Sequence, residues 1–218
     1  MTLRHRSFAS EEMYRIVGKR LVAFEGQQLA DLLTAHARVV LEVGAGDGAF
    51  LRALVAGEPT TLAIGLDAST AALERPSRLA AKLADNPLFL RAAIEAPPPE
   101  LAGLADALHV YFPWGSLFGG LVVPDDLVLA NVAGLMKLGG AFQFLLTYDP
   151  VRDAALALPA LNAAHFDALA VAYRRNGLAI NERRLATLEE IAASRSSWAK
   201  RVRSNRRREV WLLRGVRM

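Results

Sequence analysis

Three carboxylates surround a glycine-rich stretch in the first half of the chain. In "LEVGAGDGAF" (41–50), glycines stand at 44, 46 and 48, Glu42 precedes them and Asp47 lies among them. Glycine lets the backbone turn tightly and approach a ligand without a Cβ in the way. Asp67 ends the next apolar run, 23 residues beyond Gly44, where a carboxylate can accept both ribose hydroxyls of a nucleoside. The pattern predicts a site for a nucleoside cofactor.

The charge of this loop favours S-adenosylmethionine over a nicotinamide dinucleotide. Its third glycine comes one residue too early for G-x-G-x-x-G, and its carboxylates would repel the pyrophosphate that such loops bind. Negative charge suits the ammonium and sulfonium groups of S-adenosylmethionine. Glu95, after the third expected strand, is placed to border the adenine beside Ile94, although a single glutamate here is equally typical of an exposed surface. The expected cofactor residues are Glu42, Gly44, Gly46, Asp47, Asp67, Ala68, Ile94 and Glu95.

A tryptophan stands where the fourth expected strand ends. In "FPWGS" (112–116), Trp114 lies between Pro113 and Gly115, neither of which continues a strand or a helix, so we expect an exposed indole. Phe112 and Pro113 offer no polar side chain to an exocyclic amine, so contacts to a base edge would come from backbone carbonyls of 111–113. A ring nitrogen with a free lone pair needs no general base, and catalysis would consist of positioning and desolvating it.

A second tryptophan lies in a strongly basic segment near the end of the chain. A base flipped out of folded RNA needs aromatic surfaces, worth about 1–3 kcal/mol per base. Trp114 offers one surface, and Trp198 offers the other if segment 188–205 folds over the mouth of the cofactor site. The nearby arginines would hold phosphates, which sets position rather than sequence. These are Arg201, Arg203, Arg206, Arg207 and Arg208.

Charge is distributed unevenly along the chain. Residues 194–218 hold nine Lys or Arg and one Glu, whereas residues 1–193 hold 17 basic and 21 acidic residues. A run of this kind is also typical of a solvated tail, but an apolar strand pattern around Trp211 follows it, so we expect Trp211 in the core and the tail folded back. Two further groups of basic residues could bind RNA, although each is also typical of a solvated face. The first is Arg75, Arg78 and Lys82, and the second is Arg15, Lys19 and Arg20.

Composition narrows the class of protein. The chain has 218 residues, 53% hydrophobic and 22% charged, which suits one α/β domain spanning 1–218. Apolar runs are shorter than the roughly 20 residues of a membrane span, and the first residues are charged where a signal peptide is apolar. We expect a cytoplasmic monomer. Absent cysteines and four scattered histidines predict no metal site.

Short apolar runs alternate with helical patterns, which predicts a parallel sheet with crossover helices. The layout is that of a class I S-adenosylmethionine-dependent methyltransferase (Rossmann-like), with seven mostly parallel strands and an antiparallel last strand. Residues 1–25 would form an N-terminal extension or hairpin. Residues 149–177 and residues 188–205 would be inserted segments that face RNA, and the second of these would be a long basic loop. Strands are expected at 38–43, 61–68, 87–94, 107–112, 141–148, 178–186 and 209–216, and helices at 26–36, 48–57, 69–85, 124–137 and 162–176.

The motifs together carry a family resemblance. The chain resembles the aminoglycoside-resistance 16S rRNA (adenine(1408)-N(1))-methyltransferases of the Kam and Npm type. The matching motifs run in order from Tyr14 onward and cover nearly the whole chain; residues 1–13 and 153–164 depart from the pattern. They are "VGKR", "LEVGAGDG", "GLDA", "AAIEAPPP", "FPWGSL", "LTYD" and "SSWAKR".

The resemblance implies methylation at N1 of adenine 1408 in the assembled 30S subunit, with resistance to kanamycin-like and apramycin-like drugs. Trp114 and Trp198 would sandwich the flipped adenine, with Pro113 and its neighbours at the base edge. Ser116 and Ser196 fall on cofactor positions, and Arg208 on the position that holds the flipped nucleotide's phosphate. Two alternatives remain: a tRNA guanine-N7 or small-molecule methyltransferase, and a ribosome-associated protein that binds S-adenosylmethionine without transferring its methyl group.

Overall fold

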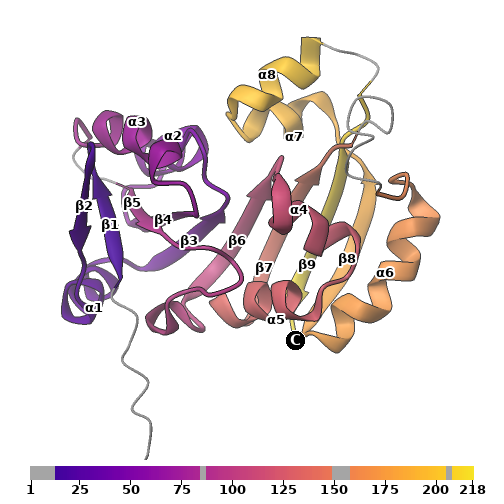
Figure 1. Cartoon of the computed structure of the whole chain (residues 1–218), viewed down its shortest axis with the longest axis horizontal. Coiled ribbons are helices and arrows are strands. Elements are labelled where there is room, and N and C mark those ends of the chain that lie inside the picture. Colours follow the sequence, from indigo (N-terminus) through magenta and orange to yellow (C-terminus); the bar gives the residue numbers. More distant parts are fainter. Residues whose placement is uncertain (1–12, 84–86, 149–157, 205–207) are drawn as a thin grey trace, which may run out of the picture.

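The computed structural model describes residues 13–83, 87–148, 158–204 and 208–218, with only the backbone for 201–204. One nine-stranded sheet crosses the molecule from β2 at one edge to β8 at the other (Figure 1), in the order β2-β1-β5-β4-β3-β6-β7-β9-β8. The strands are β1 Tyr14–Val17, β2 Arg20–Ala23, β3 Arg38–Val43, β4 Thr61–Asp67, β5 Leu88–Arg91, β6 Ala105–Tyr111, β7 Met136–Leu146, β8 Leu178–Leu185 and β9 Trp211–Arg217.

Strand direction confirms the predicted methyltransferase layout. Strands β3 to β7 pair in parallel, whereas β9 runs antiparallel to both of its neighbours, β7 and β8. The basic tail therefore returns to the domain, and Trp211 is only 9% exposed, as expected. The predicted count of seven strands is wrong, because β1 and β2 form an N-terminal hairpin that pairs with β5 and extends the sheet by two.

Helices cover both faces of this sheet. They are α1 Gly26–Ala35, α2 Ala49–Gly57, α3 Thr70–Ala80, α4 Gly115–Val122, α5 Asp126–Leu135, α6 Ala163–Arg175, α7 Leu188–Ala193 and α8 Ser197–Ser204, with a 3-10 turn at Pro99–Leu101. Leu62, Ile64 and Leu66 of β4 pack in the larger hydrophobic cluster with α1, α4, α5 and α6, while Ala63 packs in a second cluster with α2 and α3. This alternation follows from the two-residue period of a strand.

Several predicted boundaries are wrong for local reasons. The helix expected at 124–137 begins after Asp125, whose side chain accepts from the amides of Leu127 and Val128, and ends at Leu135, because Met136 already starts β7. The helix expected at 69–85 ends at Ala80. The connection expected as a long basic loop contains two helices, α7 and α8, and the helix α4 follows Trp114.

Helix α6 lies within the segment 149–177 that was expected to face RNA. Its Phe166, Leu169 and Tyr173 are buried, and the Tyr173 hydroxyl donates to the carbonyl of Leu121. One face of α6 is therefore part of the core. Residues 149–157 of the segment lie outside the described residues, and an RNA-facing role for the rest of it stays a prediction. Within the described residues, no single helix is long and apolar enough to span a membrane, although α4 and α5 together, bent by 100°, pass that test by length and composition.

Candidate active site

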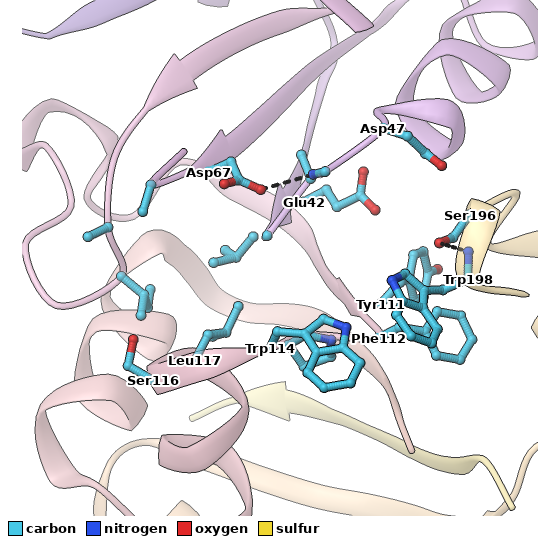
Figure 2. A pocket seen from close by; sticks show the side chains of 18 of the residues that line it. Glu42, Asp47, Asp67, Tyr111, Phe112, Trp114, Ser116, Leu117, Ser196 and Trp198 are labelled. Carbon is cyan, nitrogen blue, oxygen red and sulfur yellow. Dashed lines mark hydrogen bonds between the residues drawn. The ribbon is translucent and has the colours of Figure 1, made fainter. Parts of the chain in front are cut away.

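A pocket of about 280 Å³ opens where the strands of the sheet's centre end. Ligands of open α/β sheets bind at the carboxyl ends of the strands. Figure 2 shows three carboxylates along one side of this pocket and the two indoles along the other. The pocket is lined by every residue expected to bind the cofactor or the base: Glu42, Gly44, Gly46, Asp47, Asp67, Ala68, Ile94, Glu95, Phe112, Pro113, Trp114, Ser116, Ser196 and Trp198. Their individual roles stay predictions.

The glycine loop is fixed against the neighbouring strand. The amides of Gly44 and Ala45 donate to the carbonyl of Leu66 at 2.8 and 3.0 Å. Gly48 has φ +57°, and a Cβ there would lie 2.7 Å from the ring of Phe89. Glycine is thus required both by the backbone conformation and by the close approach of the ring.

Asp67 closes the loop from the end of β4. Its Oδ2 accepts from the Gly46 amide at 3.1 Å, and its Oδ1 accepts from the Ser69 amide at 2.8 Å. Each carboxylate oxygen has two acceptor sites, so both retain capacity for a hydroxyl in the pocket. The geometry suits a carboxylate that binds the ribose of a cofactor.

Glu42 is the most unusual acid in the pocket. It is 4% exposed, and no donor among the described residues reaches its Oε2. Burial raises the pKa of this carboxyl well above its ordinary value, and the nearby carboxylates of Asp47 and Asp67 raise it further. A buried acceptor without a partner is costly unless a ligand supplies the donor. The ammonium group of S-adenosylmethionine is such a donor, so the residues present fit this cofactor.

An asparagine that the sequence did not single out fixes the adenine side of the pocket. Asn131 of α5 donates its Nδ2 to the carbonyls of Ile94 and Glu95, at 2.8 and 3.1 Å. These bonds set the backbone on which the expected adenine contacts depend. An asparagine within a helical pattern carries no signal of this role, because its partners lie 37 and 36 residues away in the sequence.

Both tryptophans follow a residue with left-handed backbone. Phe112 has φ +52° two positions before Trp114, and Arg195 has φ +55° three positions before Trp198. For a bulky side chain this conformation costs about 1–3 kcal/mol and persists only where the surroundings enforce it. Phe112 is enforced by its buried ring and by its amide, which donates to the Leu145 carbonyl at 2.8 Å. Trp114 is consequently turned outward and is 46% exposed, as expected.

The two indoles contact each other directly. Their ring centroids are 5.0 Å apart and their planes are inclined by 44°. A base held between two parallel rings needs about 7 Å between them, twice a stacking distance of roughly 3.4 Å. Trp198 also packs against the cluster that contains Tyr111 and Phe112. The indoles are therefore neighbours, but they must separate and become more parallel to admit a base.

A polar chain runs from the pocket across the sheet. The Tyr111 hydroxyl lies 2.8 Å from His109 Nδ1 and accepts from Gln143 Nε2 at 3.2 Å, while Arg214 Nε donates to Gln143 Oε1 at 2.8 Å. Because arginine only donates, Gln143 must turn its oxygen to Arg214 and its amide to Tyr111, so the Tyr111 hydroxyl accepts from Gln143 and keeps its hydrogen available for His109 Nδ1. Burial lowers the pKa of His109 to about 4, helped by the charges of Arg38 and Arg214. The histidine is neutral, consistent with accepting this bond.

The same chain reaches the helix that precedes Trp198. Arg214 pairs with Glu182 at 3.2 Å and with Glu190 of α7 at 3.0 Å. Arg184 pairs with Glu190 through both terminal nitrogens, at 2.8 and 2.7 Å. The hydrogen bonds from Arg184 hold the pKa of Glu190 down at about 2. The pocket wall at Tyr111 and the base of the Trp198 segment are thus joined by one network.

The expected RNA-binding residues are only partly described. The side chains of Arg201 and Arg203 and all of Arg206 and Arg207 lie outside the described residues, and Arg208 is half-buried. Arg75, Arg78 and Lys82 are exposed on and just after α3. The hairpin tip lies against this helix, because the Gly18 amide donates to Ser77 Oγ at 2.9 Å and this hydroxyl donates to the Ile16 carbonyl. Within the described residues, no group of three or more His, Asp or Glu could hold a metal ion.

Comparison with known proteins gives one consistent family. The family model "NpmA: 16S rRNA (adenine(1408)-N(1))-methyltransferase" matches residues 14–217. A 16S rRNA (adenine(1408)-N(1))-methyltransferase from Streptoalloteichus hindustanus is 33% identical over 205 residues, 90% of this chain and 94% of the relative. One of the same name from Escherichia coli is 29% identical over 219 residues, 93% of this chain and 98% of the relative.

Solved structures agree with the sequence comparison. The 16S rRNA methyltransferase KamB superposes with a TM-score of 0.85 at 31% identity, covering 94% of this chain and 99% of KamB. The aminoglycoside resistance methyltransferase NpmB1 superposes with a TM-score of 0.78 at 32% identity, covering 94% of this chain and all of NpmB1. The expected fold class is confirmed. The match of the family model to nearly the whole chain shows that the chain belongs to the 16S rRNA (adenine(1408)-N(1))-methyltransferase family.

Proposed function

We propose that this chain transfers a methyl group from S-adenosylmethionine to N1 of adenine 1408 in the 16S rRNA of the assembled 30S subunit. The observation that carries the proposal is one pocket that combines a buried acceptor of Glu42, without a partner among the described residues, with two adjoining indoles from distant parts of the chain. The first feature suits a cationic cofactor, and the second suits a flipped base. We also propose that the protein acts as a cytoplasmic monomer and confers aminoglycoside resistance.

In this proposal the cofactor side of the pocket binds and orients. Glu42 accepts from the ammonium group, Asp67 accepts from the ribose hydroxyls, and the backbone of 94–95, fixed by Asn131, borders the adenine. Ser116 and Ser196 line the same pocket and contribute hydroxyls. When bound, S-adenosylmethionine would supply an electrophilic methyl group: the N1 lone pair of adenine would bond to its carbon as the carbon–sulfur bond breaks, and S-adenosylhomocysteine would leave. This reaction needs no general base from the protein.

The base side of the pocket positions the nucleophile. Trp114 and Trp198 separate and stack on the two faces of the flipped adenine, which replaces the stacking lost in the rRNA. The backbone carbonyls of 111–113 receive the exocyclic amine, since Phe112 and Pro113 carry no polar side-chain group. Closing aromatic rings over the base also removes water from N1. Positioning and desolvation are then the sources of the rate enhancement.

Basic surfaces hold the subunit. We infer that Arg75, Arg78 and Lys82 contact rRNA phosphates beside the hairpin tip, and that Arg208 holds the phosphate of the flipped nucleotide. The other arginines of the segment that follows Trp198 would also contact rRNA phosphates. They are Arg201, Arg203, Arg206 and Arg207. Phosphate contacts set position and make binding dependent on salt.

The test is primer extension on 30S subunits treated with the purified protein and S-adenosylmethionine. N1 methylation blocks base pairing, so a strong stop is expected at adenine 1408. Subunits carrying guanine at this position serve as the matched control and should give no stop there. Methylation of tRNA or of small molecules alone would support another methyltransferase activity, and binding of 30S subunits and cofactor without methyl transfer would support a non-catalytic role.

A further inference from the structure

One direct hydrogen bond joins the cofactor loop to the start of the Trp198 helix. The amide of Ser197, the first residue of α8, donates to Asp47 Oδ2 at 2.7 Å, across 150 residues of sequence. The other oxygen of the same carboxylate accepts from the Ala49 amide at 3.1 Å, at the start of α2. Asp47 therefore joins the first turns of two helices, one that follows the glycine loop and one that carries Trp198.

The position of this bond is favourable for the helix. The first amides of a helix have no acceptor within it, and negative charge is stabilising at this end. Ser197 immediately precedes Trp198, whose own amide donates to Ser196 Oγ at 3.1 Å. Because Ser197 is bonded directly to Trp198, a shift of the Ser197 backbone also shifts the indole of Trp198.

Other contacts and backbone geometry constrain the chain on both sides of the hydrogen bond between Ser197 and Asp47. Arg195 is left-handed just before α8, and on the other side the Arg52 guanidinium donates to the Asp47 carbonyl at 2.7 Å. Asp47 is thus held in place by α2, and the connection from α7 to α8 is held in place by Asp47. The contact transmits the position of the cofactor loop to the indole.

We propose that Asp47 is a positioning residue for Trp198, setting the second base-stacking indole relative to the loop that holds the cofactor. This inference rests on the proposed function. Asp47 then acts on the flipped base through Ser197 and Trp198, not by contact with the base. A direct cofactor ligand at this position would have a different signature, because its loss would weaken cofactor binding first.

Two variants remove the bond from opposite sides. Asp47→Asn keeps one oxygen, which can still accept from Ala49, and loses the acceptor for Ser197. Ser197→Pro removes the amide donor at the first position of a helix, where proline is well tolerated. Ser197→Ala keeps the backbone donor and separates the loss of the amide hydrogen from the loss of the hydroxyl. Asp31→Asn on α1, an exposed site, is the matched control for the change of carboxylate to amide.

The measurement is steady-state methylation of 30S subunits, together with S-adenosylmethionine affinity by calorimetry. Asp47→Asn and Ser197→Pro should each lower kcat/KM for the subunit about 10-fold to 100-fold, the range expected for a misplaced active-site group. Cofactor Kd should stay within about twofold in Ser197→Pro, and in Asp47→Asn it should change much less than kcat/KM does; retained cofactor binding also shows that the variants are folded. Ser197→Ala should lose far less than Ser197→Pro, and Asp31→Asn should match the unaltered protein.

The double variant decides whether the two losses report one bond. If Asp47 and Ser197 act through their contact, the double variant loses about as much as either single variant. Losses that multiply, wild-type kinetics in Asp47→Asn, or a fall in cofactor affinity that accounts for the whole loss would each overturn the inference. Failure of the unaltered protein to methylate adenine 1408 would instead contradict the proposed function.

Discussion

Glu42 shows how burial makes a side chain specific for one charge. The carboxyl lies in the pocket with an acceptor that no described residue satisfies, and burial raises its pKa, as do its carboxylate neighbours Asp47 and Asp67. Without a ligand the buried carboxyl therefore prefers its neutral form more than an exposed carboxyl does. A cation in the pocket reverses this preference, so cofactor binding and ionisation of Glu42 favour each other.

This coupling predicts a pH dependence of cofactor binding. As pH falls from neutral, Glu42 takes up a proton in the cofactor-free protein at a higher pH than in the cofactor-bound protein. The affinity for S-adenosylmethionine should therefore fall. Because the pKa in the folded state is raised, Glu42 also destabilises the cofactor-free fold as pH rises through that pKa. Calorimetric titrations over pH should show both a lower affinity and a flatter profile for Glu42→Gln, and thermal unfolding without cofactor at neutral pH should show a more stable variant. An unchanged pH profile would exclude Glu42 as the titrating group.

The two tryptophans should matter for methylation of the base and not for binding of the cofactor. Trp114→Ala and Trp198→Ala should each reduce methylation of 30S subunits by about 5-fold to 150-fold, since one stacking surface is worth about 1–3 kcal/mol. Cofactor affinity should stay within a few fold, because neither indole is needed for the contacts of Glu42 or Asp67. Filter-based methyl incorporation and calorimetry measure the two effects. The Phe variants should retain part of the activity, and equal loss of cofactor binding in both Ala variants would show that the indoles are structural.

Sequence reasoning worked best for residues whose neighbours constrain them. Pro113 and Gly115 exclude a core role for Trp114, whereas the apolar strand around Trp211 indicates burial, and the structure agrees with both predictions. Asn131 and Ser197 could not be found in this way, because their roles depend on partners far away in sequence. Their residue types are ordinary for a helix and for a helix start.

At the scale of elements, the segment that carries Trp198 is held by charge as well as by packing. Thr187 and Glu190 form a reciprocal cap at the start of α7, and Glu190 also pairs with Arg184 of β8 and Arg214 of β9. The guanidinium groups remain partly in water, so the pairs are weaker than buried ones. One carboxylate nevertheless serves both the helix start and the ion pairs.

Replacing this carboxylate should destabilise the domain in a pH-dependent way. Glu190→Gln should cost about 1–2 kcal/mol at neutral pH, the scale of a partly exposed charged hydrogen bond. The pKa of Glu190 is lowered in the folded protein, so its contribution is present above the ordinary pKa of glutamate and is lost as pH falls toward 2. Thermal unfolding at several pH values measures this. A difference from the unaltered protein that does not shrink in acid would contradict the assignment.

Elements that were missed or only partly predicted had weak or misread signals. The hairpin β1–β2 lies within residues 1–25, where an extension or hairpin is expected, but its strands of only four residues each were not counted in the sheet. Helix α4 contains three glycines, which are poor helix formers, and is stabilised by burial of Leu117, Phe118 and Leu121. Helix α7 does carry the Thr-x-x-Glu capping pattern, which could have predicted its start. The long apolar strands, by contrast, were found because periodicity and length agree.

At the scale of the whole molecule, the sheet brings together what the sequence keeps apart. The order β4-β3-β6 places the ends that carry Asp67, Glu42 and Trp114 side by side, and β9 between β7 and β8 returns the Trp198 segment to the same edge. Strand patterns predict a mostly parallel sheet with an antiparallel last strand, but not this strand order. They do not predict that the indoles meet at 5.0 Å and 44°, because that geometry depends on Phe112, Arg195 and the Asp47 contact.

Primer extension on purified 30S subunits treated with this protein and S-adenosylmethionine shows directly whether adenine 1408 is methylated at N1. We expect a strong stop at adenine 1408, which is absent without cofactor and absent from subunits with guanine at that position. The stop should be greatly reduced with Trp114→Ala and Trp198→Ala. Full incorporation of methyl groups into the subunit with no stop at adenine 1408, or no incorporation at all, would contradict the proposed function.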